Sequence, residues 1–121
     1  MKTCILCDFE DDDYGRKAFE NEHVIVIEQY AKMTTGKALI VPKRHVVSPF
    51  DLNENEWSSL YDAFLFAKSI IDLRYHPAGY TLGCNIGKVA GQTMEHAHFH
   101  IYPRFEDEKN VGKSIGQLIR S

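Results

Sequence analysis

The sequence predicts an α+β domain in which an antiparallel β-sheet packs against one long helix. Two observations lead to this prediction. Short runs of β-branched and apolar residues lie on both sides of a longer segment whose apolar residues recur every three or four positions. Strands that follow one another in this way, with one helix among them, form an antiparallel sheet that the helix covers on one face. The 121 residues suit one domain, which we expect to span residues 1–121.

Three segments have the composition of strands. Residues 22–27 (EHVIVI) and residues 37–41 (KALIV) are rich in β-branched side chains, and Pro42 ends the second run. Residues 80–85 (YTLGCN) form the third expected strand. The acidic residues 11–15 (DDDYG) are typical of a solvated turn.

The long helix is expected between the second and third strands. Asn53 and Glu56 have the spacing of a capping box, in which each side chain bonds the other residue's backbone N–H. The helix should end near Tyr75 and His76, because Pro77 disfavours helical backbone before it. The apolar stripe that we expect to face the sheet consists of Trp57, Leu60, Tyr61, Phe64, Ala67 and Ile71.

Three histidines near the end of the chain constrain function most. His96, His98 and His100 alternate with apolar residues, which is the period of a strand, so we expect them to share one face. A face of three imidazoles indicates either a metal site or catalysis by an imidazole near neutral pH. The isolated His23 and His76 lie beside ordinary strand and turn signals, and we interpret them as structural or surface residues.

The two interpretations of the three histidines differ in geometry. In the first, all three imidazoles bind one metal ion, as in some hydrolytic zinc enzymes. In the second, one imidazole is the nucleophile and a neighbour handles phosphate and protons. Same-face neighbours on a strand are about 7 Å apart, so His96 and His100 would be about 13 Å apart. A straight strand therefore aims three side chains poorly at one ion, and His98 is better placed as a separate actor.

Cysteine usage and charge limit the class of protein. Cys4 and Cys7 form a C-x-x-C pair that can offer two thiolates to a metal, with two unliganded thiols as the alternative. A redox pair is disfavoured because no βαβ unit surrounds Cys4. With Cys84 the count is odd, and there is no signal-peptide pattern or run of about 20 apolar residues. We therefore expect a cytoplasmic protein with no membrane partner. The net charge of −3 argues against broad binding of nucleic acid.

The loop before the histidines favours phosphate binding. Gly87 and Gly91 allow backbone N–H groups to approach an anion closely. Gln92 and Thr93 add short polar donors just before the histidines. Asn85 ends the preceding expected strand and can lie beside them.

Residues 91–104 (GQTMEHAHFHIYPR) resemble the signature of the histidine-triad (HIT) family of nucleotide hydrolases and transferases. That signature is H-φ-H-φ-H-φ-φ, with φ apolar, preceded by G-Q-S/T. Residues 85–87 (NIG), residues 38–45 (ALIVPKRH) and the N-terminal C-x-x-C pair also match, so the resemblance covers nearly the whole chain. It implies a HIT-like α+β fold with an antiparallel sheet, one long helix and a short additional helix, assembled as a homodimer. Leu65 and Phe66 lie off the apolar stripe and are candidates for the contact with the second subunit.

The resemblance also implies a mechanism. His98 would attack the α-phosphorus of a nucleotide, and water would then cleave the nucleotidyl-imidazole. The attacking nitrogen must be unprotonated, so we expect a backbone carbonyl to hold the other N–H. His100 would hydrogen-bond the phosphate. The other implied substrate-binding residues are Asn85, Gly91, Gln92 and Thr93, the last two on the phosphate oxygens or the leaving group.

The resemblance further implies a structural zinc ion. In zinc-carrying relatives the first histidine of the triad binds the metal together with a C-x-x-C pair and the histidine after the Pro-Lys strand. Carried over to this chain, the ligands are Cys4, Cys7, His45 and His96. This Cys₂His₂ set leaves no open catalytic position.

The chain departs from the family pattern at two places. The residue that holds the ribose hydroxyls falls at Gln29, next to Glu28, where relatives usually carry Asp or Asn. Gly36 and Lys37 stand where Gly-His often precedes the next strand, and the added lysine favours longer polyphosphates. Residues 102–104 (YPR) resemble branches that cleave dinucleoside polyphosphates more than they resemble purine phosphoramidases.

The predicted function is therefore that of a hydrolase acting on phosphorus anhydrides. Its substrate would be an adenine nucleotide such as a diadenosine polyphosphate, cleaved through a covalent nucleotidyl-histidine intermediate. A nucleoside phosphoramidase is the alternative within the same chemistry. Two alternatives of other classes are a nucleotide-binding or regulatory protein with vestigial activity, and a zinc-binding module in which every histidine is a ligand.

Overall fold

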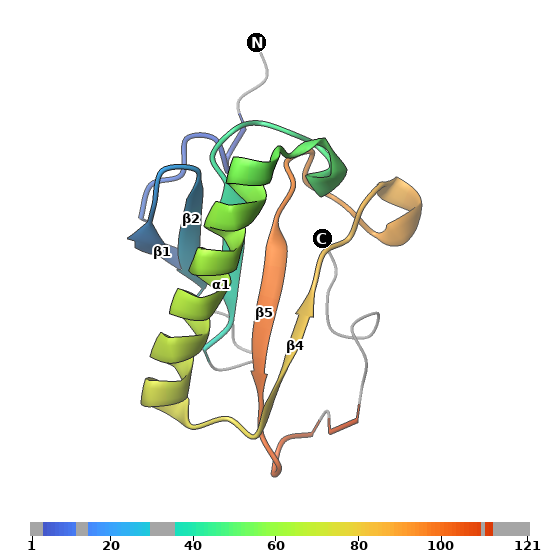
Figure 1. Cartoon of the computed structure of the whole chain (residues 1–121). Coiled ribbons are helices and arrows are strands. Elements are labelled where there is room, and N and C mark those ends of the chain that lie inside the picture. The colour runs from blue at the N-terminus through green and yellow to red at the C-terminus, as the bar shows by residue number, and fades with distance from the viewer. Residues whose placement is uncertain (1–3, 12–14, 30–35, 110, 113–121) are drawn as a thin grey trace.

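The computed structural model describes residues 4–11, 15–29, 36–109 and 111–112 (Figure 1). Within them, five strands form one antiparallel sheet in the order β1-β2-β3-β5-β4. The helix α1 (Glu54–Tyr75) lies across one face of this sheet and contacts β1, β2 and β3. The strands are Gly15–Glu20 (β1), Val24–Gln29 (β2), Ala38–Pro42 (β3), Gly79–Gly83 (β4) and Phe99–Arg104 (β5). The predicted fold class is confirmed.

One strand of the sheet, β1, was not predicted. Its sequence, GRKAFE, carries three charged residues and lacks a β-branched run. The strand lies at the edge of the sheet and pairs only with β2, with a register shift between Lys17 and Phe19. An edge strand can hold charged side chains because water reaches it. Such a strand lacks the apolar pattern from which strands are predicted. Gly15, which we assigned to a turn, is the first residue of β1.

The sheet has a buried core on each face, because neighbouring residues of a strand point to opposite sides. On β3, Ala38 and Ile40 belong to the cluster that packs under α1. Leu39 and Val41 belong to a second cluster, which Leu6 of the N-terminal segment covers. Both faces of β3 are thus shielded from water, and the chain segment that carries the C-x-x-C pair is anchored to the face opposite the helix.

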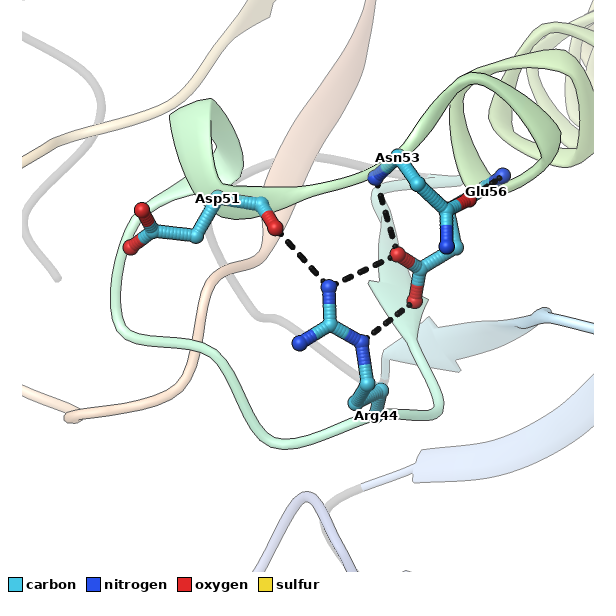
Figure 2. A network of polar contacts seen from close by, with 4 residues as sticks. All are labelled: Arg44, Asp51, Asn53 and Glu56. Carbon is cyan, nitrogen blue, oxygen red and sulfur yellow. Dashed lines mark hydrogen bonds and ion pairs between the residues drawn. The ribbon is translucent and has the colours of Figure 1, made fainter.

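The helix α1 begins as the sequence predicts. Asn53 Oδ1 accepts a hydrogen bond from the Glu56 N–H at 2.9 Å, and Glu56 Oε1 accepts one from the Asn53 N–H at 3.0 Å. Arg44 clamps this capping box: its Nε and Nη2 lie 3.1 and 2.8 Å from the two Glu56 oxygens, and Nη2 also donates to the Asp51 carbonyl (Figure 2). The loop after β3 is therefore tied to the start of the helix. At the other end, His76 caps the helix in a left-handed conformation, with φ of 51°.

We expect replacement of Glu56 by glutamine to lower the free energy of unfolding by about 1–3 kcal/mol at pH 7. The Glu56 side chain is buried, and Arg44 lowers the pKa of this carboxyl. A lowered pKa stabilises the fold above the ordinary glutamate value of 4.5, and this stabilisation is lost as the pH falls through the folded-state pKa. Glu54→Gln, in the same helical turn but exposed, is the matched control. Urea denaturation at pH 7 and pH 3 measures both variants. Equal losses for the two variants would contradict the assignment.

The predicted core stripe of α1 is partly wrong. Trp57 and Tyr61 are 40% and 62% exposed, whereas Leu60 and Ala63 are fully buried. The helix is apolar over more than one face, so its periodicity alone cannot say which face meets its own sheet. Phe66, expected at a subunit contact, stacks on Phe19 of β1 with ring centroids 4.2 Å apart. The residues of α1 that face the sheet are Leu60, Ala63, Ala67 and Ile71, with Phe64 packed against them.

Two further expectations concern single helices. Residues 113–119, whose sequence fits either a short helix or a tail, lie outside the described residues. In the described part of the chain, no helix combines the length and the apolar character that a membrane crossing requires.

Candidate functional site

The histidine segment does not form the strand that its alternation predicts. Strand β5 begins at Phe99, so His96 and His98 precede it. The Ala97 N–H donates to the Val46 carbonyl at 2.7 Å, which pairs this segment with the loop after β3. The apolar residues between the histidines, Ala97 and Phe99, both pack in the core under α1. The bend before β5 allows His96 to turn toward different neighbours from those of the later histidines.

The four predicted metal ligands, Cys4, Cys7, His45 and His96, come together in one cluster. Their ligand atoms all lie within 4.8 Å of one another. Cys7 Sγ is 3.1 Å from His45 Nδ1 and 3.4 Å from His96 Nδ1. Cys4 Sγ is also 3.4 Å from His96 Nδ1. These three separations are close to the edge of a tetrahedron whose centre lies about 2.0–2.3 Å from each ligand atom.

The orientation of His96 suits a metal ligand. Its Nε2 lies 2.7 Å from the Pro42 carbonyl oxygen. A carbonyl oxygen only accepts hydrogen bonds, so Nε2 carries the proton and the lone pair lies on Nδ1, facing both thiols. Metal-binding histidines usually have this kind of partner on the other ring nitrogen, because it fixes the tautomer and the ring plane. The last residue of β3 thus orients the imidazole.

The Cys7 thiol needs a cation in order to ionise. Desolvation, together with a hydrogen bond and charge interaction with Cys4 and the charge of Asp8, raises the pKa of Cys7 to about 11. A thiol in such surroundings keeps its proton unless a positive charge joins it. Two thiols and two imidazole nitrogens gathered within 4.8 Å of one another form a donor set that fits zinc.

His98 has the geometry of a nucleophile. Its side chain is buried, and Nδ1 lies 2.8 Å from the His96 carbonyl oxygen. Because the carbonyl only accepts, Nδ1 carries the proton and the lone pair lies on Nε2. The expectation of a backbone carbonyl partner is confirmed. Burial lowers the pKa of His98, and the positive charge of Lys37 lowers it further, although the bond to the carbonyl opposes both. The ring is therefore neutral at physiological pH.

His100 is the immediate partner of His98. The two rings meet edge-on with centroids 5.1 Å apart. His100 is buried, and burial together with the charge of Lys37 lowers its pKa to about 3. A neutral imidazole keeps one N–H and can donate it to an oxygen of a phosphate group. The structure brings these two histidines together and places His96 in the Cys-His cluster.

Gln92 has a role that its sequence position does not reveal. Its Nε2 donates to the carbonyls of Val47 and Met94, both at 2.9 Å, and its Oε1 accepts from the Gly87 N–H at 2.8 Å. The amide thereby fastens the glycine loop to the loop after β3. Gly87 and Gly91 both have positive φ, of 90° and 100°, which side chains with a Cβ rarely adopt. This loop is shaped by backbone hydrogen bonds as well as by glycine.

The remaining predicted pocket residues are distributed around this loop. A Cβ at Gly91 would lie 3.5 Å from the Asn85 amide nitrogen, so these two residues are neighbours. Thr93 lines a pocket of about 450 Å³ beside the Cys-His cluster, together with Lys88 and Gln92. The lining of this pocket includes neither His98 nor His100. The structure therefore places Thr93 on the side of the loop that faces the Cys-His cluster.

The structure distinguishes between Glu28 and Gln29, the two candidates for the ribose position. Both oxygens of Glu28 are engaged, by Arg16 at 2.8 Å and by Arg74 at 2.9 Å. Gln29 follows on the opposite face of β2, which is the face that carries His100 on β5. Gln29 is therefore the residue of the two that shares a face with the histidines.

Comparison with known proteins identifies the family. The model of the HIT domain matches residues 11–107, and the chain belongs to this family. The protein hit of Bacillus subtilis is 30% identical over 99% of this chain and 97% of its own length. A bis(5'-adenosyl)-triphosphatase of Dictyostelium discoideum is 33% identical over 76% of this chain and 63% of its own length. An adenosine 5'-monophosphoramidase of Schizosaccharomyces pombe is 28% identical, over 91% and 80% of the two chains. The family therefore includes nucleotide hydrolases.

Solved structures show the same fold. A HIT family protein from Bacillus anthracis has 30% identity and a TM-score of 0.74, over 86% of this chain and 74% of its own. A zinc-bound histidine triad family protein from Mycobacterium smegmatis also has a TM-score of 0.74, at 24% identity, over 88% and 78% of the two chains.

Proposed function

We propose that this protein is a nucleotidyl hydrolase in which His98 is the nucleophile. The observation that carries the proposal is the 2.8 Å bond between His98 Nδ1 and the His96 carbonyl. It holds a buried imidazole in the one tautomer that can attack through Nε2, without need of a separate base. The similarity to a bis(5'-adenosyl)-triphosphatase and to an adenosine 5'-monophosphoramidase supports this class of reaction.

The proposed reaction has two steps. The Nε2 lone pair attacks the α-phosphorus of a nucleotide, and the bond from phosphorus to the leaving group breaks with its electron pair. Water then attacks the same phosphorus and loses a proton to the surrounding solvent. The bond from phosphorus to Nε2 breaks with its electron pair on the nitrogen, which restores the neutral ring. His100 donates its N–H to a phosphate oxygen as negative charge develops there. An imidazole suits the task because it both attacks phosphorus and leaves it readily.

The loop residues would contribute to the site in different ways. Gln92 is a positioning residue, because its amide bonds two backbone groups of its own loop, at Gly87 and Met94, and the Val47 carbonyl in the loop after β3. The N–H groups of Ala90, Gly91 and Gln92 already donate to the carbonyls of Gly87 and Lys88, so they maintain the shape of the loop and the expected donation to an anion does not come from them. Asn85 lies beside Gly91, and Gln29 contacts the ribose. Thr93 lines the pocket beside the Cys-His cluster and is therefore assigned no contact with the phosphate that His98 attacks.

The proposed substrate is an adenine nucleotide with a phosphoanhydride, such as a diadenosine polyphosphate. Hydrolysis of a nucleoside phosphoramidate is the second candidate, favoured by the likeness to a monophosphoramidase. A turnover screen with diadenosine triphosphate, diadenosine tetraphosphate and adenosine 5'-phosphoramidate tests the proposal. We expect turnover of at least one of them. Tight nucleotide binding without turnover would instead favour a regulatory, nucleotide-binding protein.

We further propose that Cys4, Cys7, His45 and His96 hold a structural zinc ion, as their spacing and tautomers allow. The zinc-bound structural relative supports the choice of metal. The ion would tie the N-terminal segment to the end of β3 and to the bend before β5. Because His96 also offers its carbonyl to His98, the metal would fix the nucleophile indirectly. A cytoplasmic location would keep both thiols reduced.

We propose a homodimer formed through the face of α1 that carries Trp57, Tyr61 and Leu65. Trp57, Tyr61 and Leu65 recur at four-residue steps and are 40%, 62% and 49% exposed. Leu82 of the edge strand β4 is 48% exposed. A row of large apolar side chains on one helix face is typical of a surface that another subunit covers.

We expect the protein to sediment as a dimer at micromolar concentration and Tyr61→Glu to sediment as a monomer, because a carboxylate would be buried without a partner. Leu73→Glu is the matched control, since Leu73 is 73% exposed nearer the other end of the same helix. This control should remain dimeric. A monomeric wild-type protein in analytical ultracentrifugation would contradict the proposal.

A further inference from the structure

Lys37 occupies a position next to the histidine pair that the proposed mechanism leaves unused. It stands one residue before β3, where Ala38 pairs with Ile101 and Leu39 pairs with His100. The register places Lys37 opposite Tyr102, on the face of the sheet that carries His100. Its Nζ lies 4.9 Å from the centroid of the Tyr102 ring.

Within the described part of the chain, no carboxylate lies within ion-pair distance of the Lys37 ammonium group. Its cross-strand neighbour is Gln29, whose N–H donates to the Lys37 carbonyl at 3.0 Å, and an amide side chain cannot neutralise it. The side chain is half-buried, and burial lowers its pKa. A partly desolvated cation of this kind gains from an anion that joins it.

The position of this charge relative to the nucleophile indicates which anion it would meet. The rings of His98, His100 and Tyr102 follow one another, with centroid separations of 5.1 and 6.1 Å. The Lys37 ammonium lies over the third ring. The ammonium therefore lies one ring beyond His100, and an anionic group that extends toward Tyr102 from a phosphoryl group on His98 and His100 would meet it.

We propose that Lys37 binds the phosphate groups beyond the α-phosphate, so that the site selects substrates with an anionic polyphosphate leaving group over those with a neutral one. This inference rests on the proposed function, because it assigns the leaving group of that reaction. The ligand class is a dinucleoside polyphosphate, in which two or more phosphates separate the nucleosides. Lys37 acts as a fixed positive charge and donor, and it neither gives nor takes a proton in the reaction.

The test compares two substrates that share the adenylyl group. Diadenosine triphosphate expels an anionic nucleotide. Adenosine 5'-phosphoramidate expels neutral ammonia, because its nitrogen takes up a proton from water as the bond to phosphorus breaks. Lys37→Met removes the charge and keeps the length of the side chain, and Lys37→Arg keeps the charge. We expect Lys37→Met to lower kcat/KM for the triphosphate about 10- to 100-fold and to leave the phosphoramidate nearly unchanged. Lys37→Arg should keep most of the selectivity. Lys43→Met, which removes an exposed lysine paired with Glu20, is the control and should change neither rate.

A second measurement does not depend on turnover. Calorimetry with inorganic tripolyphosphate should show binding to the wild-type protein and to Lys43→Met, and weaker binding to Lys37→Met. Lys37→Gln serves as a second neutral variant if the methionine variant fails to fold. Should the wild-type protein hydrolyse neither substrate, the proposed function fails, and loss of tripolyphosphate binding in Lys37→Met would still support the anion site. Equal losses on both substrates, or unchanged tripolyphosphate binding in the neutral variants, would overturn the role of Lys37.

Discussion

Replacing His98 with alanine is expected to lower turnover on the order of a thousandfold or more while the nucleotide still binds. The reason lies in the tautomer. The bond from Nδ1 to the His96 carbonyl leaves the Nε2 lone pair as the attacking group, and no other described side chain shares that arrangement beside His100. Steady-state kinetics on the substrate that the screen identifies give the loss in kcat, and calorimetry gives the binding.

His100→Ala should be milder than His98→Ala, because it removes one donor to the phosphate and keeps the nucleophile. His23→Ala is the control, since His23 lies outside the site at the start of β2 and should leave kcat unchanged. Circular dichroism should confirm that each variant keeps its fold. Turnover of His98→Ala near the wild-type rate would disprove the nucleophile and the enzyme function built on it.

The double change of Cys4 and Cys7 to serine is expected to have the largest effect on stability. If the cluster holds zinc, metal binding is coupled to folding, and its loss removes a large fraction of the roughly 5–15 kcal/mol that such domains possess. The wild-type protein should contain about one zinc ion per chain, and the variant none. Thermal melting and elemental analysis measure both effects.

Cys84→Ser is the matched control, because Cys84 is the third free cysteine and lies outside the cluster. It should keep the metal and melt near the wild-type temperature. Wild-type protein prepared without chelator and found to contain no metal would contradict the zinc site. If the double variant melts at the same temperature as Cys84→Ser, the structural role of the zinc site is contradicted. Metal bound by His98 and His100 would instead favour a metal-dependent mechanism.

Local sequence patterns predict the parts of the fold that local energetics dominate. A few neighbouring residues are enough to recognise the capping box of Asn53 and Glu56 and the β-branched run of β2. The structure contains both. Strand β1 has no such signal, because pairing with β2 stabilises it more than its own composition does. Which face of α1 meets the sheet, and which carries Trp57 and Tyr61, is decided by the whole fold.

The candidate site shows the same division. Residue identity and family resemblance name the four members of the Cys-His cluster, and the structure brings their ligand atoms together. The groups that orient the histidines are backbone carbonyls, of Pro42 for His96 and of His96 for His98. Every residue has a carbonyl, so no sequence pattern marks the one that is used. For the same reason, the three backbone partners of Gln92 cannot be predicted from the sequence.

The central claim is most directly tested by trapping the covalent intermediate. Enzyme mixed with a substrate radiolabelled at the α-phosphorus is quenched within a single turnover, digested, and its labelled peptide is sequenced by mass spectrometry. We predict one adenylyl group per active chain, attached to His98, and no label on His98→Ala. Rapid hydrolysis by the wild-type protein with no labelled peptide, or with the label on another residue, would contradict the claim.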